Sequence, residues 1–431
     1  MNDTTMPLED RLEPLSSLLK GMPAGAGTIP LAAVARQRWN ILREDVALPV
    51  AVLRRSALER NAQWMRAFCE AADVVMAPHG KTTMSPQLFR AQIEAGAWAI
   101  TVATLQQLRV CRAFGHRRVV LANQLIGRQA IAAVTAELRS DAAFEFYCLV
   151  DSVRGVEILA EALAADPVGR PLNVLLEGGI PGGRTGCRTV GDALAVARAV
   201  RDASPHLALT GVEGFEGLNA EASDEAVRGF LGHLVGIAEA CAREALFAEG
   251  PVLLSAGGSA FFDLVADAFH GADLQRPVRV LTRSGCYISL DAVLYRRAIE
   301  RLLGRKPALA RLGPPPTNAL EVCTYVQSRP EPEKVILTAG KRDLSHDVHL
   351  PVMLHWHRPG ESGPRAAPAG HIVAGLNDQH AHMAVPADSP LRVGDMVALG
   401  VSHPCTTFDK WQALFVVDES YDVVGAIRTF F

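Results

Sequence analysis

Short apolar runs alternate with alanine-rich amphipathic stretches over the first two thirds of the chain. Eight apolar runs have strand length: 73–77, 98–102, 118–122, 144–150, 172–176, 208–213, 251–255 and 278–282. Most gaps between them have helical periodicity, for example Leu105–Val110 and Ala193–Ala203. Helices between Val- and Leu-rich strands are typical of βαβ units with a parallel sheet. Eight strands in about 210 residues predict a (β/α)8 barrel. The alternative, an open doubly wound sheet, more often has a glycine fingerprint after its first strand, and we find none.

The pattern changes after about residue 300. Leu312–Pro316 predicts a stiff linker, and alternating runs then replace helical periodicity: Glu321–Val326, Lys334–Thr338, Val348–His355, Asp395–Val401 and Ala413–Val417. We therefore predict a barrel domain at 46–305 and a C-terminal β domain at 306–431. Residues 1–45 are polar and interrupted by proline, and we predict an arm that packs with the β domain.

Composition limits the class of protein. A chain of 431 residues, 49% hydrophobic and 21% charged, predicts a soluble globular protein of two domains. The net charge is −3 and the sequence has no basic patch, which argues against nucleic-acid binding. No apolar stretch approaches the ~20 residues of a membrane span, and the start lacks signal-peptide character. Eight cysteines occur singly, without a C-x-x-C pair, and this favours a reducing cytoplasm.

Residues 77–84 join the first predicted strand to a helical pattern that opens after Ser85. Lys81 therefore lies on a strand-to-helix loop, where α/β proteins place their chemistry. A phosphate-binding P-loop is excluded because Val75 stands where that motif requires glycine. A desolvated lysine amine is a nucleophile toward aldehydes, so a Schiff base with pyridoxal phosphate is one hypothesis. A solvated surface lysine is the ordinary alternative.

The loops after the seventh and eighth predicted strands, Ser255–Ser259 and Arg283–Tyr287, combine serine and glycine. Barrels commonly bind phosphate with these two loops, because glycines let backbone N–H groups approach an anion. The predicted cofactor contacts there are Ser255, Gly257, Gly258, Ser259, Gly285, Cys286 and Tyr287. Either loop alone is also compatible with an ordinary turn. Gln124 follows the third strand, and Arg184 on a glycine-rich loop could bind a cofactor ring or a carboxylate, or only stabilise its loop.

His403 and Cys405 lie two residues apart in the β domain. Residues at this spacing on an extended backbone face the same side, so imidazole and thiolate could share a zinc ion. An isolated His-x-Cys more often binds no metal. His380 and His382 form a second polar cluster with the same ambiguity.

These segments together resemble the fold-type III pyridoxal-phosphate enzymes of the D-threonine aldolase and D-serine dehydratase family, from about residue 46 to 420. Pro78–Thr82 looks like the family's Pro-His-x-Lys-Thr element, whose lysine carries the cofactor. Leu149–Ser152, Gly214–Gly217 and Arg283–Tyr287 are similar to further family segments. The resemblance implies an alanine-racemase-like (β/α)8 barrel, a C-terminal β domain and a homodimer.

The resemblance also implies a divalent metal, zinc or another, on His403 and Cys405. Family members with His-x-Cys resemble zinc-dependent dehydratases, whereas the aldolases carry His-x-Asp. We therefore expect a dehydratase that converts a D-3-hydroxy amino acid, such as D-serine, to a 2-oxo acid and ammonia. Lys81 would hold the cofactor and move the Cα proton, with His79 and Arg184 as further candidates. A retro-aldol cleavage and a non-catalytic cofactor-binding protein are the alternatives. The chain departs from the family at Thr83-Met84, where the family carries His-Lys.

Overall fold

A computed structural model describes residues 8–216, 222–258 and 260–431. The chain divides into two compact units. A barrel unit contains residues 66–81 and 93–285, and a β unit contains the chain up to 65 together with residues 82–92 and 286–431. Two helices, α1 (Arg55–Ala71) and α2 (Pro86–Glu94), contribute residues to both units. Within the described ranges no helix combines the length and apolarity needed to cross a membrane.

Eight parallel strands form the sheet of the barrel unit, in the order β2-β9-β8-β7-β6-β5-β4-β3. Their bounds are β2 (Val75–Met76), β3 (Ile100–Val102), β4 (Arg118–Gln124), β5 (Glu145–Val150), β6 (Leu172–Gly178), β7 (Leu207–Gly214), β8 (Val252–Ala256) and β9 (Val278–Thr282). The sheet closes between its two end strands. Beyond β2, the Thr101 amide donates to the Pro78 carbonyl at 2.9 Å, and His79 forms a parallel bridge with Thr101. All eight predicted strands are thus confirmed, with shifts of a few residues at their ends.

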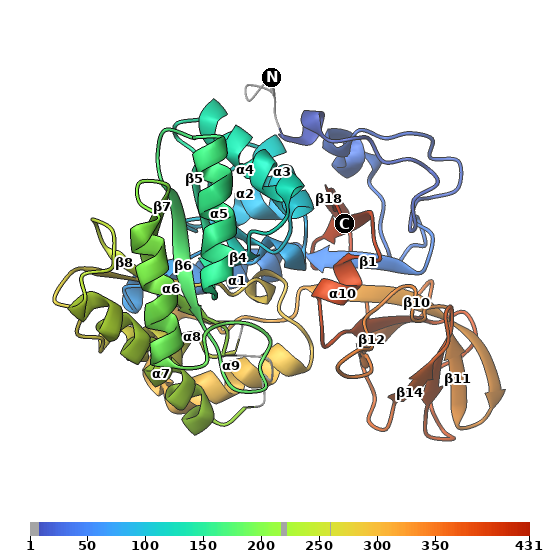
Figure 1. The fold of residues 1–431 in the computed structure, drawn as a ribbon. Helices are drawn as coiled ribbons and strands as arrows, with labels where there is room; N and C mark the ends of the chain where they lie inside the picture. The colour runs from blue at the N-terminus through green and yellow to red at the C-terminus, as the bar shows by residue number, and fades with distance from the viewer. Residues whose placement is uncertain (1–7, 217–221, 259) are drawn as a thin grey trace. The chain divides into compact units, whose positions relative to one another are not determined.

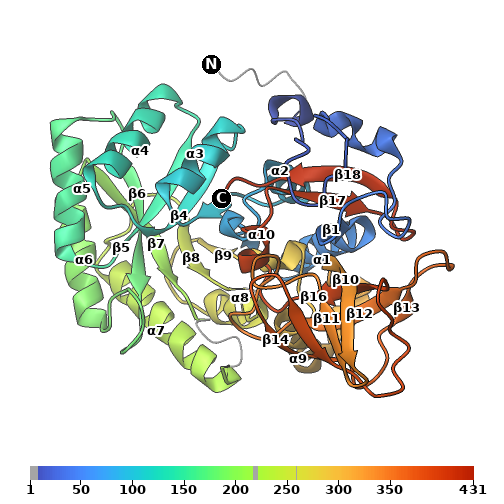
Figure 2. The same cartoon turned by 90° about the vertical axis from the view of Figure 1, so that its right-hand side faces the viewer.

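Helices alternate with these strands and lie outside the sheet (Figures 1 and 2). They are α3 (Leu105–Ala113), α4 (Arg128–Ser140), α5 (Val153–Ala165), α6 (Val190–Asp202), α7 (Asp224–Arg243) and α8 (Phe262–His270). Four of them begin after a residue whose hydroxyl accepts a backbone N–H in the first turn: Thr104, Ser152, Thr189 and Ser223. Phe68 of α1 packs edge-on against Phe262 of α8, with ring centroids 4.7 Å apart.

The inside of the barrel is apolar. One buried cluster draws side chains from most of the strands or from residues next to them: Ala77, Ala99, Val120, Tyr147, Leu149, Leu175, Leu253 and Leu281. β7 contributes Gly211 instead, where a Cβ would lie 1.9 Å from the Leu253 carbonyl oxygen. Because side chains fill the interior, polar chemistry in this unit is restricted to the loops at the strand ends.

The β unit contains a sheet in the order β13-β12-β16-β10-β1-β17-β18, extended by β11, β15 and β14. The bounds are β1 (Val50–Arg54), β10 (Leu320–Glu331), β11 (Lys334–Leu337), β12 (Val352–His357), β13 (Arg365–Ala366), β14 (Ile372–Leu376), β15 (Ala381–Ala384), β16 (Met396–Gly400), β17 (Ala413–Val417) and β18 (Val423–Arg428). Its helices are α9 (Leu294–Arg305) and α10 (Cys405–Phe408), and its 3₁₀ turns include η1 (Leu8–Arg11), η2 (Leu31–Gln37), η4 (Cys286–Ile288) and η5 (Pro307–Leu312).

This sheet departs from the predicted boundaries. β1 pairs with β10 and β17, so the first strand within the range predicted for the barrel, 46–305, belongs to the β unit. The predicted run Val348–His355 enters the sheet only at Val352. Before that point, the His349 amide donates to the Ser402 hydroxyl at 3.0 Å instead of to a neighbouring strand.

The N-terminal segment contacts the β sheet. The Asn40 side-chain amide donates to Asp422 at 2.8 Å, and the rings of Trp39 and Phe415 lie 5.7 Å apart. The Lys20 amine lies 3.2 Å from the Asp343 carboxylate. Each contact joins residues more than 300 positions apart in the chain, so the segment is part of the packing of this unit.

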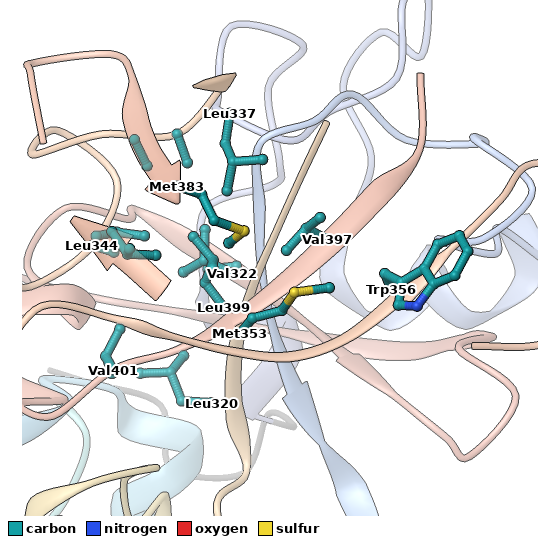
Figure 3. Close-up of a cluster of buried hydrophobic side chains, with 14 of the residues drawn as sticks. Leu320, Val322, Leu337, Leu344, Met353, Trp356, Met383, Val397, Leu399 and Val401 are labelled. Carbon is teal, nitrogen blue, oxygen red and sulfur yellow. The ribbon is translucent and has the colours of Figure 1, made fainter. Parts of the chain in front are cut away.

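A buried cluster fills the β unit, with Val322, Met353, Trp356, Val397 and Leu399 among its members (Figure 3). Leu399 has no exposed surface and lies opposite Val322 and Met353 on the two neighbouring strands.

We predict that Leu399→Ala lowers the free energy of unfolding of this unit by about 2–5 kcal/mol, because the surrounding strands cannot close the cavity. Val393→Ala is the matched control, since Val393 is 63% exposed, and it should change the value by less than about 0.5 kcal/mol. Urea unfolding followed by tryptophan fluorescence measures both. Equal effects of the two substitutions would contradict this assignment of the core.

Candidate active site

Lys81 lies in η3 (Gly80–Thr82), directly after β2 and before α2. The Ser85 carbonyl accepts the Phe89 amide at 2.9 Å, so α2 begins after Ser85 as the sequence predicts. Lys81 is exposed, whereas Thr82 and Thr83 are buried. The lysine amine is therefore accessible, and a bound ligand would have to supply any desolvation of it.

His79 is held by the hydrogen bonds that close the barrel. Burial lowers the pKa of His79 well below its usual value, and the positive charges of Lys81, Arg283 and Arg184 lower it further. Its imidazole is therefore neutral at physiological pH. In the described part of the chain, no hydrogen-bond partner is found for its Nδ1 atom, which is buried. A neutral imidazole among three cations suits the neighbourhood of an anionic ligand.

The predicted phosphate loop after β8 binds a carboxylate in this structure. The amides of Gly257 and Gly258 donate to the two oxygens of Glu216, at 2.8 and 2.7 Å. Gly257 has a φ of +99°, which favours glycine and lets both amides point to the same side. This arrangement is an anion-binding backbone site, and a phosphate would require the same donors. The loop therefore fits a phosphorylated cofactor, with Glu216 occupying the place of the anion.

The loops after β8 and β9 contact each other. The Ser284 hydroxyl donates to the Gly258 carbonyl at 3.0 Å, and the Arg283 amide donates to the Gly257 carbonyl at 3.1 Å. Ser255 is fully buried, and within the described residues its hydroxyl has no hydrogen-bond partner. Ser259 lies outside the described residues. Gly285 is the last residue of the barrel unit in this region, and Cys286 and Tyr287 belong to the β unit.

Two carboxylates lie at the ends of β6 and β7. Glu177 accepts from the Gln124 amide at 2.5 Å and from the Thr185 hydroxyl at 2.6 Å. Glu213 pairs with Arg283 at 2.6 Å, and both side chains are almost fully buried. Burial raises the pKa of Glu213 to about 7, against the opposing charge of Arg283. The predicted contact Gln124 is therefore part of a polar network with Glu177.

Arg184 lies on the loop after β6, with its guanidinium 5.7 Å from the centre of the Phe215 ring. Arg188 shapes this loop by donating to the carbonyls of Gly186 at 2.9 Å and Gly183 at 2.7 Å. A cavity of about 20 Å³ lies beside Arg184, between Ile180 and Phe215. Within the barrel unit the predicted residue thus faces an aromatic side chain, while the neighbouring arginine stabilises the loop.

In the β unit, His403 is oriented by a carboxylate. Its Nδ1 atom lies 2.6 Å from Asp347 Oδ2, and the Thr406 hydroxyl donates to the other Asp347 oxygen at 2.9 Å. Metal-binding histidines usually have such a partner on one ring nitrogen, which leaves the other nitrogen for the metal. Imidazole and thiolate are donors that zinc accepts, so His403 and Cys405 fit a zinc ion in their chemistry.

Cys405 begins α10 and contacts a hydroxyl and a second thiol. Its Sγ atom lies 3.4 Å from the Thr82 hydroxyl and 3.6 Å from Cys286 Sγ. Among the residues with described coordinates, no three or more His, Cys, Asp or Glu side chains form a group that could hold a metal ion. His382 lies apart from these residues in the sequence, on β15, with its ring nitrogen 2.6 Å from Asn377.

Three contributors were not predicted as site residues from the sequence. Asp347 is 56 positions from His403, and no motif joins them. Glu216 and Glu177 occur near predicted loops, but only the folded chain pairs them with Gly257, Gly258 and Gln124. Glu216 stands in Gly214–Gly217, which is similar to a family segment, but the sequence alone assigns it no role.

Comparison with known proteins decides the family. Residues 53–277 match the family described as "Alanine racemase, N-terminal domain", which is more than half of the chain. The chain belongs to this family. Residues 319–417 of the chain also match the family described as "Putative serine dehydratase domain". The fold is thus the alanine-racemase-like fold that the sequence predicts, a curled parallel sheet with helices and an antiparallel β domain.

Several known proteins are similar to this chain over most of its length. A D-threonine aldolase from Arthrobacter sp. is 25% identical over 376 residues, which are 86% of this chain and 89% of that protein. The structure of a D-threonine aldolase from Filomicrobium marinum matches with a TM-score of 0.72 and 21% identity, covering 89% of this chain and 95% of that one. D-threo-3-hydroxyaspartate dehydratase from Delftia sp. HT23 matches with a TM-score of 0.71 and 22% identity, covering 91% and 99%.

We predict that Glu216→Gln binds inorganic phosphate and pyridoxal phosphate about tenfold more tightly, because the competing hydrogen bonds lose their charge. Titration calorimetry with phosphate, and absorbance with pyridoxal phosphate, measure the two affinities. Glu225→Gln removes one charge from the exposed start of α7 and is the control. Unchanged or weaker binding by Glu216→Gln would contradict competition by Glu216.

A second prediction concerns Glu213. Its pKa of about 7 in the folded protein exceeds the ordinary 4.5, so the folded state binds more protons between these values. Stability is therefore lost as pH rises through this window, and glutamine cannot titrate. Relative to wild type, Glu213→Gln should gain up to about 3 kcal/mol between pH 4.5 and pH 8.

Urea unfolding at several pH values measures this difference. Glu157→Gln, at an exposed carboxylate of α5, controls for the loss of one charge. If Glu213→Gln instead lost stability relative to wild type as pH rises, the ion pair with Arg283 would outweigh burial.

Proposed function

We propose that this protein is a pyridoxal-phosphate-dependent lyase that removes water from a D-3-hydroxy amino acid, such as D-serine. The released enamine would then hydrolyse to a 2-oxo acid and ammonia. The observation that carries elimination is the donor pair in the β unit. His403 is held by Asp347 at 2.6 Å, and a thiol, Cys405, follows two residues later where aldolases of the family carry a carboxylate. The matches to a serine dehydratase domain and to a D-threo-3-hydroxyaspartate dehydratase support the reaction class.

Lys81 is the proposed attachment point of the cofactor. The backbone donors of Gly257 and Gly258 would hold its phosphate, with Ser255, Ser259, Gly285 and Tyr287 as further contacts. When bound, pyridoxal phosphate supplies an electron sink for the charge left at Cα. The occupation of the loop by the Glu216 carboxylate supports this assignment, because the same donors already bind an oxyanion.

The side chains near the proposed cofactor would have the following roles. The Lys81 amine would take the proton from Cα as general base. His79, kept neutral by burial and by three nearby cations, donates or accepts one hydrogen bond without adding charge. Arg184 binds the substrate carboxylate or the cofactor ring. Gln124, with its oxygen unconstrained by the bond to Glu177, is a further polar contact.

His403 and Cys405 would hold the metal, with Asp347 orienting the imidazole. Bound zinc supplies a Lewis acid that makes the β-hydroxyl a better leaving group. A mutant of D-threo-3-hydroxyaspartate dehydratase is described as a metal-free form, and this supports a metal in this chain as well. A homodimer in the cytoplasm completes the proposal.

Retro-aldol cleavage of a D-3-hydroxy amino acid is the second candidate. It rests on the 25% identity with a D-threonine aldolase over 86% of the chain. The same cofactor residues would serve, but a base would take the β-hydroxyl proton, and glycine and an aldehyde would result. A cofactor-binding protein without catalysis is disfavoured by the second domain match at residues 319–417.

The deciding experiment combines a spectrum with product assays. Purified protein is expected to have a visible absorbance band from bound cofactor. D-serine, D-threonine and D-3-hydroxyaspartate are then supplied with and without a chelator. A 2-oxo acid whose formation the chelator suppresses supports elimination, and aldehyde with glycine supports the aldolase. Absence of the band, even after adding pyridoxal phosphate, would refute the role of Lys81.

Two variants separate the tasks. Lys81→Ala should lose the cofactor band and at least ~10³-fold in kcat, because no other amine replaces the base. Cys405→Ala should keep the band and lose chelator-sensitive turnover. Loss of the band in Cys405→Ala would contradict the division between cofactor and metal residues.

A further inference from the structure

The loop after β6 carries Arg184 and is closed at its base. The Cys187 amide donates to the Glu177 carbonyl at 2.8 Å, and the Gly179 amide donates to the Cys187 carbonyl at 2.9 Å. Gly178 and Cys187 also form a bridge of the kind found between paired strands. The two ends of the loop are therefore fixed to each other, and contacts inside the loop set its shape.

The guanidinium of Arg188 fills the inside of this loop. It donates to the carbonyls of Gly183 at 2.7 Å and Gly186 at 2.9 Å, and also to that of Thr185. A Cβ atom added to Gly179 would lie 2.1 Å from Arg188 Nη1, so the start of the loop encloses the guanidinium from the other side. One side chain thus holds the backbone of the loop at several points.

Two carboxylates hold the same part of the loop. The Thr185 hydroxyl donates to Glu177 at 2.6 Å, and the Gly186 amide donates to Asp151 at 3.1 Å. Both hydrogen bonds are made by the residues that directly follow Arg184. The backbone that carries the Arg184 side chain is therefore restrained on this side by carboxylates as well as by Arg188.

Arg184 itself is exposed. Its guanidinium lies over the Phe215 ring, 5.7 Å from the ring centre. A guanidinium over an aromatic ring keeps its N–H groups in its own plane, where they can bind an oxyanion. Burial lowers the pKa of His79, and nearby cations that include Arg184 lower it further. Arg184 therefore lies within electrostatic reach of the segment that leads to Lys81.

We propose that Arg188 is a positioning residue that holds Arg184, through the backbone of the loop, where its guanidinium binds an oxygen anion of the ligand. This inference rests on the proposed function, which assigns the substrate carboxylate or the cofactor ring to Arg184. Both ligands offer the same chemistry, an oxygen that carries negative charge. Displacement of a binding group by about 1 Å can cost about 10²-fold, so the shape of the loop matters for the reaction.

Arg188→Lys tests this role because it keeps the positive charge but loses the planar fork of donors. An ammonium group cannot reproduce the fixed geometry with which a guanidinium meets several carbonyls. Arg188→Lys should therefore weaken, by about tenfold, the same affinity that Arg184→Lys weakens.

Two measurements identify the ligand. If Arg184 binds the substrate carboxylate, both variants should raise KM for the D-amino acid that wild type turns over, with kcat changed by less than about threefold. If Arg184 binds the cofactor ring, both should raise the Kd of pyridoxal phosphate, measured from the cofactor absorbance band.

The double variant separates positioning from an independent effect. Because Arg188 acts only through Arg184, the variant that combines Arg184→Lys with Arg188→Lys should bind no more weakly than Arg184→Lys alone. Hydrogen exchange followed by mass spectrometry gives a readout without ligand. The amides of residues 178–187 should exchange faster in Arg188→Lys and at the wild-type rate in Arg184→Lys.

Arg170→Lys is the matched control. Arg170 likewise donates to backbone carbonyls, those of Leu138 and Asp141 at 3.0 Å and of Phe144 at 2.9 Å. It precedes β6 and so lies at the opposite end of the barrel from the loop that follows this strand. Arg170→Lys should keep the wild-type KM and Kd even if it lowers stability.

Circular dichroism tests the folding of each variant. If Arg188→Lys is unfolded, Thr185→Val replaces it, because this variant removes the hydrogen bond to Glu177 from the same loop at almost unchanged volume. It should weaken the same affinity as Arg184→Lys, and it should likewise add nothing to the defect of Arg184→Lys.

The outcomes separate this inference from the function on which it rests. Wild-type affinities in Arg188→Lys, or a double variant weaker than Arg184→Lys alone, would refute positioning by Arg188 and leave the lyase intact. Wild-type affinities in Arg184→Lys would refute the ligand-binding role of Arg184 and the inference with it. Absence of the cofactor band and of turnover in wild type would refute the proposed function itself. A shared, non-additive defect with normal Arg170→Lys supports the proposal.

Discussion

The closed ring of hydrogen bonds around the parallel barrel is the constraint on which the candidate site depends. Next to β2, the Ala77 amide donates to Thr282 of β9 at 2.8 Å, and the Thr101 amide donates to Pro78 at 2.9 Å. The segment that leads to Lys81 is thus held on both sides by neighbouring strands. Because all eight strands are parallel, their carboxyl ends and the loops that follow them lie at one end of the barrel.

Charge at this end of the barrel is balanced group by group. Arg283 pairs with the buried Glu213, and Glu216 occupies two backbone amides that suit a phosphate. His79 avoids a charge altogether because burial and nearby cations oppose its protonation. The unit thus holds an anion site that is already satisfied internally, and a ligand must compete with a carboxylate of the chain for it.

Two of the four boundaries between the units lie next to candidate site residues. Lys81 ends one segment of the barrel unit and Thr82 begins a segment of the β unit, and the same holds for Gly285 and Cys286. Thr82 and Cys286 both contact Cys405 in the β unit. Within the β unit, Thr82, Cys286 and Cys405 therefore form one group of contacting side chains.

Much of the fold follows from local pattern alone. Strands of β-branched and leucine residues and helices of period 3.6 identify all eight barrel strands, and the helix after Ser85 begins as its sequence predicts. These features depend on neighbours in the chain, so the sequence by itself determined them. The sequence by itself also determined that Lys81 follows the first barrel strand and that His403 and Cys405 lie two residues apart.

Only the tertiary structure decided which distant groups meet. β1 belongs to the β unit because it pairs with β10 and β17. The paired residues Val322 and Phe415 lie about 270 and 360 residues further along the chain. Asp347 with His403, and Cys286 with Cys405, are likewise separated by 56 and 119 positions. Local periodicity carries no information about such pairs, because packing of the whole unit sets the distances between them.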